Sequence, residues 1–245
     1  MSLNLTIDQG NTAAKIALWD GDTLVALSIE PHLSVGHVEN FVRGHEPIHS
    51  IMYCSVASKG AELLQGISHL AKRVMRLNYT TPLPISIDYA TPHTLGADRI
   101  AAAVGAWATL PGCNLLVVDA GTAVTYDAVN AEGHFLGGNI APGMHMRLEA
   151  LHRFTARLPR VRVPRELKCT RFLGNDTPSA MILGAVYGIV GAISYYRNHM
   201  SPDTQVVMTG GWAAELSKLC DFDVLVEPNL VSKGLNRILI YNEDK

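Results

Sequence analysis

Apolar residues gather in three short runs within the first thirty positions, and this pattern predicts three strands. The runs are LNLTI, AAKIALW and TLVALSI, at residues 3–7, 13–19 and 23–29. Polar turns separate them, and the second turn contains an Asp-Gly pair, which favours a tight hairpin. The sequence therefore predicts an antiparallel meander, with the turn DQGNT directly after its first strand.

Helical and extended patterns alternate from there to residue 112. We expect helices at 35–43, from 60 to about 72 and at 96–110, and strands at 48–56, 74–77 and 85–87. The third helix is rich in alanine and ends at Pro111-Gly112, a pair that stops a helix. This pair is the predicted boundary between two domains, 1–112 and 113–245.

The pattern then starts again. The strand NLLVVD at 114–119 runs into DAGTA, and a second strand, VTYDAV, ends in a polar turn. The segments 8–12 and 119–123 thus each follow an apolar strand and precede another one. We interpret this as the duplication of one hairpin, without the fixed period of a solenoid. Duplication predicts two related halves with a cleft between them.

The remainder of the second half repeats the alternation. Helices are predicted at 144–153, after Pro178, at 212–219 and from about 231, and strands at 204–211 and 223–227. Alternating strands and helices indicate an α/β protein with helices on both faces of its sheets. Whether the last helix packs on the first half is left open by the sequence.

Composition and charge argue against a protein that binds nucleic acid. The 245 residues are 48% hydrophobic and 17% charged, with a net charge of −2, which argues against binding nucleic acid through a general basic field. The basic segment 153–171 has no aromatic residue except Phe154, and we interpret it as a solvated connector. We therefore expect no nucleic-acid partner.

The cysteines and the apolar segment 180–196 indicate a cytoplasmic location and no membrane. Cys54, Cys113, Cys169 and Cys220 are far apart and form no metal-binding pair, so we expect reduced thiols. The N-terminus lacks the pattern of a signal or transit peptide. Segment 180–196 is uncharged, but its glycines and tyrosines favour a buried, closely packed helix over a membrane span. The histidines form no recognisable metal-ligand set, since Pro47 separates His45 from His49 and His145 with His152 lacks a third ligand.

Each glycine turn has the chemistry of a phosphate site. A glycine has no Cβ, so the backbone N–H groups around Gly10 and Gly121 can form a small concave donor site for an anion. Asp8 would then hold Mg²⁺, through water, and Lys15 would neutralise phosphate charge. An ordinary β-turn with local hydrogen bonds explains either hairpin alone. The duplication favours a polyphosphate held from both halves.

Two further segments carry candidate chemistry. In GADR, at 96–99, Asp98 is either a charge at a helix start or a general base for a substrate hydroxyl, and Arg99 can bind a substrate carboxylate. In TGG, at 209–211, the glycine pair permits close approach of adenine or ribose, and it is equally compatible with a packed turn.

These segments together resemble those of type III pantothenate kinases, a branch of the acetate and sugar kinase/Hsp70/actin superfamily. The similar segments, in chain order, are DQGNTAAK (8–15), YATPHTLGADR (89–99), DAGTAVTYD (119–127), GGNIAPG (137–143), GNDTPSAMILGAVYG (174–188), TGG (209–211) and VEPNLVSKGLN (226–236). The resemblance implies an α/β fold of two duplicated actin-like, ribonuclease H-like domains. Each domain has a mixed sheet flanked by helices, and an ATP cleft lies between them.

The resemblance also implies an activity: transfer of the ATP γ-phosphate to the primary hydroxyl of pantothenate, giving 4′-phosphopantothenate in the first step of coenzyme A biosynthesis. It makes Asp98 the catalytic proton acceptor. The implied contacts with ATP and its phosphates are Asp8, Gln9, Gly10, Asn11, Thr12, Ala13, Ala14, Lys15, Gly121, Thr122, Gly210 and Gly211. The implied contacts with pantothenate are Tyr89, Gly96, Ala97, Asp98, Arg99 and Thr177.

The same resemblance implies the cofactors and the assembly. Asp119 is similar to the family's ligand for a monovalent cation, K⁺ or NH₄⁺, and Asp8 would hold Mg²⁺ with ATP. Members of the family are homodimers in which the partner chain completes the pantothenate pocket, so Thr177 would act across the interface. Gln9 and Trp212 depart from the family pattern. Gln9 can face away from the phosphates, whereas Trp212 could alter the pocket for the nucleotide base.

Two other functions remain open on the sequence alone. One is another enzyme of the superfamily, a sugar or acyl kinase or an exopolyphosphate hydrolase, which would share the hairpins but not GADR with Tyr89. The other is an accessory factor that binds nucleotide and regulates gene expression through a partner. Three aspartates, at 8, 98 and 119, favour catalysis over binding alone.

Overall fold

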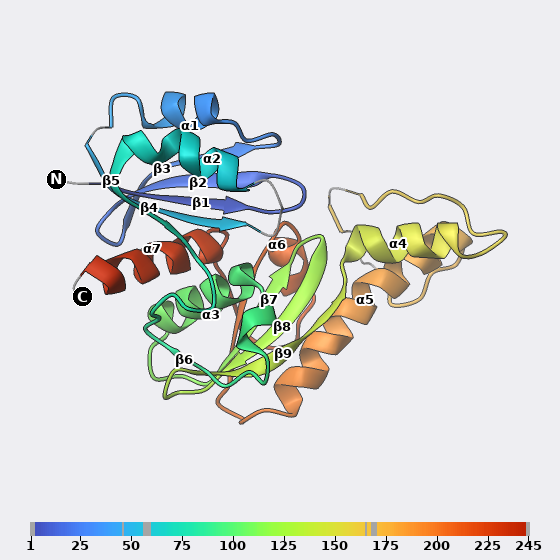
Figure 1. The fold of residues 1–245 in the computed structure, drawn as a ribbon. Helices are drawn as coiled ribbons and strands as arrows, with labels where there is room; N and C mark the ends of the chain where they lie inside the picture. The colour runs from blue at the N-terminus through green and yellow to red at the C-terminus, as the bar shows by residue number, and fades with distance from the viewer. Residues whose placement is uncertain (1–2, 46, 56–59, 165, 168–170, 244–245) are drawn as a thin grey trace. The chain divides into compact units, whose positions relative to one another are not determined.

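The structure is a computed structural model that describes residues 3–45, 47–55, 60–164, 166–167 and 171–243. The chain forms two compact units (Figure 1). The first consists of Met1–Gly112, Glu132–Leu136 and Asn229–Lys245, and the second of Cys113–Ala131 and Gly137–Pro228.

A five-stranded sheet forms the centre of the first unit. Its strands are β1 (Leu3–Gln9), β2 (Ala14–Asp20), β3 (Thr23–Glu30), β4 (Ile48–Ser55) and β5 (Ala71–Arg76), in the order β3-β2-β1-β4-β5. The first three strands are antiparallel, which confirms the predicted meander. Strands β4 and β5 run parallel to β1 and to each other. The first strand is two residues longer than predicted, because it continues through Asp8 and Gln9.

Helices α1 (Val35–Val42) and α2 (Gly60–Ile67) cover one face of this sheet (Figure 1). They bury apolar side chains against the alternate residues of β1, β2 and β4 that point to them, such as Ile7 and Ile16. The predicted helix to residue 72 was wrong at its end. The α-helix stops at Ile67, a 3₁₀ turn covers Ser68–Leu70, and residues 71–76 pair with β4 as a strand. Long-range pairing thus outweighs a local helical pattern.

Helices α3 (Ala97–Thr109) and α7 (Leu230–Glu243) pack on each other within the first unit. A Cβ on Gly105 would lie 2.3 Å from the carbonyl oxygen of Leu230, so only glycine permits this approach. Helix α7 also contacts β1, β2 and β4, and its Asn236 side chain donates a hydrogen bond to the carbonyl of Gly21 at 2.8 Å. The final helix therefore belongs with the first unit.

The second sheet repeats the strand order of the first. Its strands are β6 (Ser86–Ile87), β7 (Leu115–Ala120), β8 (Ala123–Val129), β9 (His134–Pro142), β10 (Gln205–Thr209) and β11 (Val224–Val226), in the order β11-β10-β7-β8-β9-β6. Apart from the added β6, the order β9-β8-β7-β10-β11 corresponds to β3-β2-β1-β4-β5. Strand β1 is antiparallel to β2, as β7 is to β8. Strands β4 and β5 run parallel to β1, as β10 and β11 run parallel to β7. This correspondence confirms the predicted duplication.

Helices α4 (Met144–Arg153), α5 (Thr177–Asn198) and α6 (Ala213–Ser217) bury their apolar residues in one core with β7, β8 and β10. Helix α4 has the predicted bounds. A short 3₁₀ turn, Pro92–Thr94, precedes α3 in the first unit. Among the described cysteines, Cys54 and Cys220 are free thiols, while Cys169 lies outside the described residues.

Helix α5 is the one helix among the described residues that is long and apolar enough to cross a membrane by length and composition. Its most apolar 18-residue window has a mean hydropathy of 1.5, and 33% of that window is buried. The buried side chains, including Met181, Val186 and Ile193, form one face against the core of the second unit. The predicted burial of this helix therefore holds for one face only.

The basic connector after α4 has neither helix nor strand over residues 155–164, and most of these residues are exposed. This confirms the predicted solvated connector over its described part. Residues 165 and 168–170 of this connector lie outside the described residues.

Candidate active site

The first hairpin closes with the pair Gln9 and Ala14, and the Gly10 N–H donates to the Ala13 carbonyl at 3.1 Å. Gly10 to Thr12 are exposed at the tip. Asp8 lies one position before the end of β1, opposite Lys15 on β2, and both residues are half-buried. The prediction that Asp8 follows the strand was therefore wrong: it lies inside the strand. The structure brings Asp8, Lys15 and the glycine turn together, as the sequence predicted.

Successive residues of a strand point to opposite faces of a sheet, and this separates Asp8 from Gln9. The Gln9 carbonyl oxygen Oε1 accepts a hydrogen bond of 2.5 Å from the Tyr53 hydroxyl, on the face covered by α1 and α2. Asp8 points to the other face. The side chain of Gln9 is thus turned away from that of Asp8.

Cys54 is a buried thiol that is subject to the negative charges of two aspartates. It is opposite Asp8 in the parallel pairing of β1 and β4, and its side chain is fully buried. Burial first, and then the negative charges of Asp8 and Asp98, raise the pKa of the Cys54 thiol well above its ordinary value. Asp98 comes from α3, about ninety residues along the chain from Asp8. The fold therefore brings these two carboxylates to one side of the first sheet.

Gly96 and Asp98 form the start of α3. Asp98 is in the first helical turn, and its Oδ1 accepts a hydrogen bond of 2.9 Å from the Arg99 N–H. A Cβ on Gly96 would lie 2.4 Å from the same Oδ1, so the carboxylate folds back over the glycine. This geometry fixes one carboxylate oxygen at the helix start. It agrees with the structural alternative predicted for Asp98, a charge at a helix start.

Arg99 is held by two aromatic rings. Its side chain is 5% exposed, and its Cζ lies 5.7 Å from the ring centres of both Tyr89 and Phe135. The two rings are 6.1 Å apart at an angle of 64°. A guanidinium over aromatic faces is stabilised by their quadrupoles. Tyr89 and Arg99 were predicted from the sequence as site residues, but Phe135 was not. Phe135 lies at the start of β9, and the residues around it form no motif that would indicate a contact with Arg99.

The second hairpin is one residue shorter at its tip. It closes with Ala120 and Val124, and the Gly121 N–H donates to the Ala123 carbonyl at 3.1 Å. Asp119 lies in β7 one position before the closing pair, as Asp8 does in β1. The two hairpins thus place their aspartates equivalently, although their turns differ in length.

Two other glycines pack against the second hairpin within the second unit. Gly210 has a φ of +92°, and a Cβ there would lie 2.5 Å from Asp119 Oδ1. Gly143, which precedes α4, donates its N–H to the Thr122 carbonyl at 3.1 Å. Three segments of the second unit therefore meet around Asp119, two of which, at Gly121–Thr122 and Gly210–Gly211, were predicted to contact ATP.

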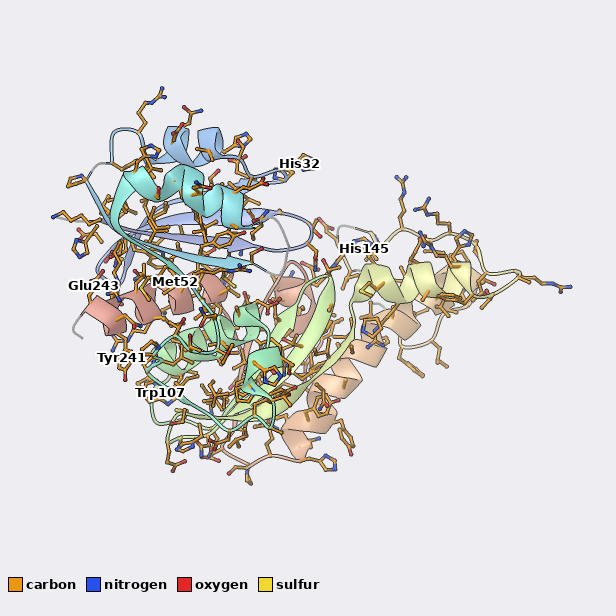
Figure 2. The ribbon with its side chains drawn as sticks, viewed as in Figure 1. His32, Met52, Trp107, His145, Tyr241 and Glu243 are labelled. Atoms are coloured by element: carbon orange, nitrogen blue, oxygen red, sulfur yellow. The ribbon has the colours of Figure 1, made fainter. Side chains whose placement is uncertain are left out.

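Trp212 continues this cluster. Its backbone N–H donates a hydrogen bond of 3.2 Å to the Ala120 carbonyl. The centre of its ring lies 5.8 Å from that of the His145 ring. Figure 2 shows His145 at the start of helix α4. The sequence singled out Trp212 but gave no signal for this neighbour, which was expected only to be an exposed or hydrogen-bonded histidine.

Thr177 is the first residue of α5 and is exposed. Asp176 caps the helix before it, accepting a hydrogen bond of 2.7 Å from the Ser179 N–H. Thr177 belongs to the second unit, whereas Tyr89, Asp98 and Arg99 belong to the first. The predicted pantothenate contacts are thus divided between the two units.

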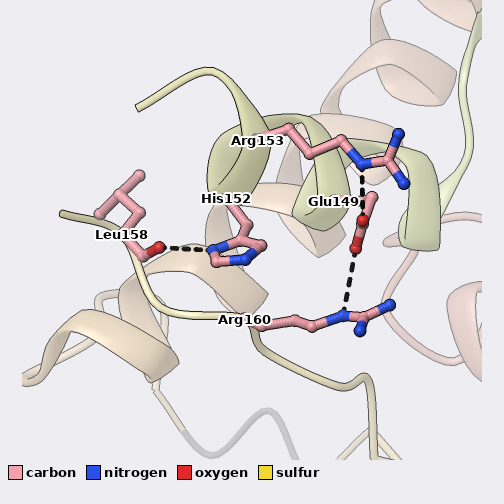
Figure 3. A network of polar contacts seen from close by, with 5 residues as sticks. All are labelled: Glu149, His152, Arg153, Leu158 and Arg160. Atoms are coloured by element: carbon pink, nitrogen blue, oxygen red, sulfur yellow. Dashed lines mark hydrogen bonds and ion pairs between the residues drawn. The ribbon is translucent and has the colours of Figure 1, made fainter. Parts of the chain in front are cut away.

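A separate cavity of about 720 Å³ lies beside α4. Its lining residues are His145, Met146, Glu149, Ala150, Arg153, Phe154, Arg160, Val161, Arg162 and Val163. Glu149 lies between Arg153, at 2.7 Å, and Arg160, at 3.4 Å (Figure 3). The hydrogen bond from Arg153, with the nearby positive charges, lowers the pKa of Glu149. Among the described residues that line this cavity, none is a predicted site residue.

Metal ligands are sparse in the described part of the chain. No three His, Cys, Asp or Glu side chains within it form a group that could hold a metal ion. Mg²⁺ needs fewer protein ligands, because it keeps several waters and takes one or two carboxylates together with substrate phosphates. Asp8, next to the glycine turn at the end of β1, fits that requirement. Asp119, at the equivalent position of the second hairpin, offers a carboxylate oxygen to a larger cation.

A family model and two curated relatives all assign this chain to the same family. Residues 4–199 match the family model described as type III pantothenate kinase. A type III pantothenate kinase of Porphyromonas gingivalis is 38% identical over 245 residues, covering 99% of this chain and 100% of the relative. The enzyme of the same description from Bacteroides fragilis is 37% identical over 246 residues, with 99% and 100% covered.

Solved structures share the fold. A Campylobacter jejuni protein described as a Baf family transcriptional activator gives a TM-score of 0.65 at 22% identity, covering 98% of this chain and 100% of that one. A Sinorhizobium meliloti protein described as a 2-dehydro-3-deoxygalactonokinase gives 0.60 at 14% identity, with 99% of each chain covered. At these identities the likeness shows the fold alone. It confirms the predicted α/β fold of two actin-like domains.

Proposed function

Because the chain belongs to the type III pantothenate kinase family, we propose that it transfers the γ-phosphoryl group of ATP to the primary hydroxyl of pantothenate, with Asp98 as the proton acceptor. The products are 4′-phosphopantothenate and ADP, and the reaction is the first step of coenzyme A biosynthesis. The observation that supports the catalytic assignment is the position of Asp98 in the first turn of α3, with one carboxylate oxygen held by the Arg99 N–H. In-line phosphoryl transfer needs positioned charges more than covalent chemistry.

Asp98 takes the proton from the attacking hydroxyl. One of its oxygens is held by the Arg99 N–H, and we assign the other to the substrate. A base fixed in this way loses little freedom when the substrate binds, and general-base catalysis of this kind contributes about 10²- to 10⁴-fold in rate.

The first hairpin binds the phosphates. The side chain of Gln9 is turned away from Asp8. The contacts we assign to this hairpin are Asp8, Gln9, Gly10, Asn11, Thr12, Ala13, Ala14 and Lys15. Asp8 holds Mg²⁺, through water. When bound, this ion neutralises charge on the phosphates.

The second hairpin contacts ATP through Gly121 and Thr122, together with Gly210 and Gly211 of the neighbouring turn. Asp119 holds the monovalent cation, K⁺ or NH₄⁺. Support comes from the close packing of Gly210 on the Asp119 carboxylate, where the lack of a Cβ lets the backbone of the neighbouring turn approach this group.

Pantothenate is held by residues at the start of α3 and by one residue of a partner chain. Arg99 binds its carboxylate and is held in place by Tyr89, while Gly96 and Ala97 contact the substrate through the backbone. Arginine matches a carboxylate with paired N–H donors. Thr177 contributes from the partner chain of a homodimer, and we place the enzyme in the cytoplasm.

A surface on α5 supports the homodimer. Nothing described lies within 4 Å of a Cβ built on Gly184 or Gly191, although this helix is apolar on all sides. Phe172 and Leu173, just before the helix, are 76% and 68% exposed. A second copy of the chain would cover these apolar residues.

One coupled assay of ADP release tests the proposal, run with and without pantothenate and with and without K⁺. We expect release only with pantothenate, and faster release with K⁺. Asp98→Asn should lower turnover by about 10²-fold or more while ATP binding, measured by calorimetry, persists. Release that does not depend on pantothenate would indicate a different acceptor. Absence of release with intact nucleotide binding would indicate an accessory factor.

A further inference from the structure

Three polar side chains support the first hairpin from the face opposite Asp8. Gln9 and Ser55 are paired at the ends of β1 and β4, and Tyr53 lies two residues before Ser55 on the same face. The Tyr53 hydroxyl donates to Gln9 Oε1 at 2.5 Å, and the Ser55 side chain also hydrogen-bonds the phenol. The end of β1 is therefore tied to β4 by side chains as well as by the backbone.

Tyr53 itself is held rigidly. Its side chain is fully buried, and its carbonyl accepts a hydrogen bond of 2.9 Å from the Leu77 N–H. A Cβ on Gly60, the first residue of α2, would lie 2.5 Å from the phenolic oxygen, so the helix closes directly over the ring. Burial also raises the pKa of Tyr53, which keeps the hydroxyl protonated and able to donate.

Gln9 is the last residue of β1 before the exposed tip of the hairpin. Beyond Gln9, the Gly10 N–H donates a hydrogen bond across the turn to the Ala13 carbonyl. The residue opposite Gln9 on β2 is Ala14, whose side chain is too small to hold that of Gln9. The position of the tip therefore depends on how firmly Gln9 is held. A hydrogen bond to the buried and closely packed phenol of Tyr53 provides that anchor.

We propose that Tyr53 is a positioning residue for ATP, acting through its hydrogen bond to Gln9 to fix the turn 10–13. This inference rests on the proposed binding of ATP phosphates by the first hairpin. Tyr53 does not touch the nucleotide. Its hydroxyl limits the movement of the turn, so that the backbone donors and Asp8 are already in place when ATP arrives.

Tyr53→Phe tests the proposal, because it removes the hydroxyl and keeps the ring. One side-chain hydrogen bond corresponds to a change of about 2- to 12-fold in an equilibrium constant. We expect the KM for ATP to rise by that factor, while the KM for pantothenate stays within about 2-fold. Gln9→Met, which removes the acceptor at similar length, should have the same effect. The double variant should be no worse than Tyr53→Phe, because that variant has already lost the contact between Tyr53 and Gln9.

Two control variants separate positioning from general loss of stability. Tyr126 is a buried tyrosine whose hydroxyl has no hydrogen-bond partner among the described residues, and Tyr126→Phe should leave the KM for ATP unchanged. Ile67→Val removes a methylene from the same core as Tyr53 and should lower stability without changing the KM. A similar rise in KM in Ile67→Val at equal loss of stability would overturn the proposal, as would additive effects in the double variant.

Amide hydrogen exchange gives a readout that does not depend on catalysis. In Tyr53→Phe we expect faster exchange in residues 10–14 and unchanged exchange in the second hairpin, residues 119–124. If the wild-type chain shows no pantothenate-dependent ADP release, the proposed function is wrong, and the exchange still tests the anchoring of the turn. Unchanged exchange and an unchanged KM for ATP in Tyr53→Phe would refute the inference.

Discussion

Gly210 packs directly on Asp119: a Cβ at residue 210 would lie 2.5 Å from the carboxylate Oδ1 and 2.6 Å from the Ala120 carbonyl carbon. The backbone of Gly210 also has a φ of +92°, which other residues rarely adopt. Conformation and space therefore both require glycine here. The turn after β10 is thus fitted to the second hairpin, in the part of the chain to which we assign ATP contacts and the monovalent cation.

Gly210→Ala should displace either the turn or Asp119. A residue forced into such a conformation costs about 1–3 kcal/mol. We expect the free energy of unfolding to fall by that amount in urea denaturation, and the KM for ATP to rise. Gly211→Ala, one residue further on, is the control for stability, because nothing lies within 4 Å of its Cβ and its φ is not positive. Equal stability of the two variants would show that the close packing on Asp119 is not a constraint.

Asp119→Ala should weaken activation by K⁺ more than it weakens folding. Asp119 is half-buried, and its equivalent position in the duplicated hairpin is Asp8. If its carboxylate is a ligand for the cation, the K⁺ concentration that gives half-maximal activity should rise by about 10-fold or more, as for the loss of a charged ligand. Activity is titrated with K⁺ at constant ionic strength, with the unfolding temperature measured in parallel. An unchanged titration contradicts the assignment.

Arg99→Lys should impair pantothenate binding, although it keeps the charge. The guanidinium lies over Tyr89 and Phe135, and an ammonium can neither stack as a plane nor offer paired donors to a carboxylate. We expect the KM for pantothenate to rise by about 10-fold or more and the KM for ATP to change little. Arg197→Lys is the matched control, since Arg197 also lies over one ring, that of Phe222, at 4.8 Å. A similar change in both variants would show that Arg99 has no specific role.

Most helices and strands could be predicted because hydrophobic periodicity and turn residues lie within the element itself or next to it. Alternation identified β1 to β3, and the alanine-rich segment with Pro111-Gly112 identified α3. The end of α2 was wrong because residues 71–76 pair with β4, and such a partner is not visible in a local pattern. The incomplete burial of α5 was missed for a similar reason, since composition does not show which faces of a helix another element covers.

The candidate site was predictable where glycines and carboxylates form motifs. The duplicated turns located Asp8 and Asp119, and GADR located Asp98 and Arg99. The side chain of Gln9 could not be placed because β1 was expected to end at Ile7. Once the strand extends through Gln9, alternation alone turns that side chain toward Tyr53. Phe135 could not be found, because only the fold brings it to Arg99.

The buried thiol of Cys54 should make stability depend on pH in the alkaline range. Burial and the charges of Asp8 and Asp98 raise its pKa well above the ordinary 9.0, so above that pH the unfolded chain releases a proton that the folded chain keeps. The contribution of this thiol to stability is therefore fully present below pH 9 and is lost as pH rises toward the folded pKa.

Cys54→Ala should remove this contribution. Above about pH 9, its free energy of unfolding should fall less steeply than that of the wild type, by about 1.4 kcal/mol per pH unit. Urea denaturation from neutral pH upward measures both slopes. Cys220→Ala is the control: partial burial and Asp221 raise the pKa of that thiol to about 11, so its effect should end near that pH. Parallel curves for Cys54→Ala and the wild type would mean that the Cys54 thiol ionises as readily in the folded chain as in the unfolded one, which would contradict its burial beside the charges of Asp8 and Asp98.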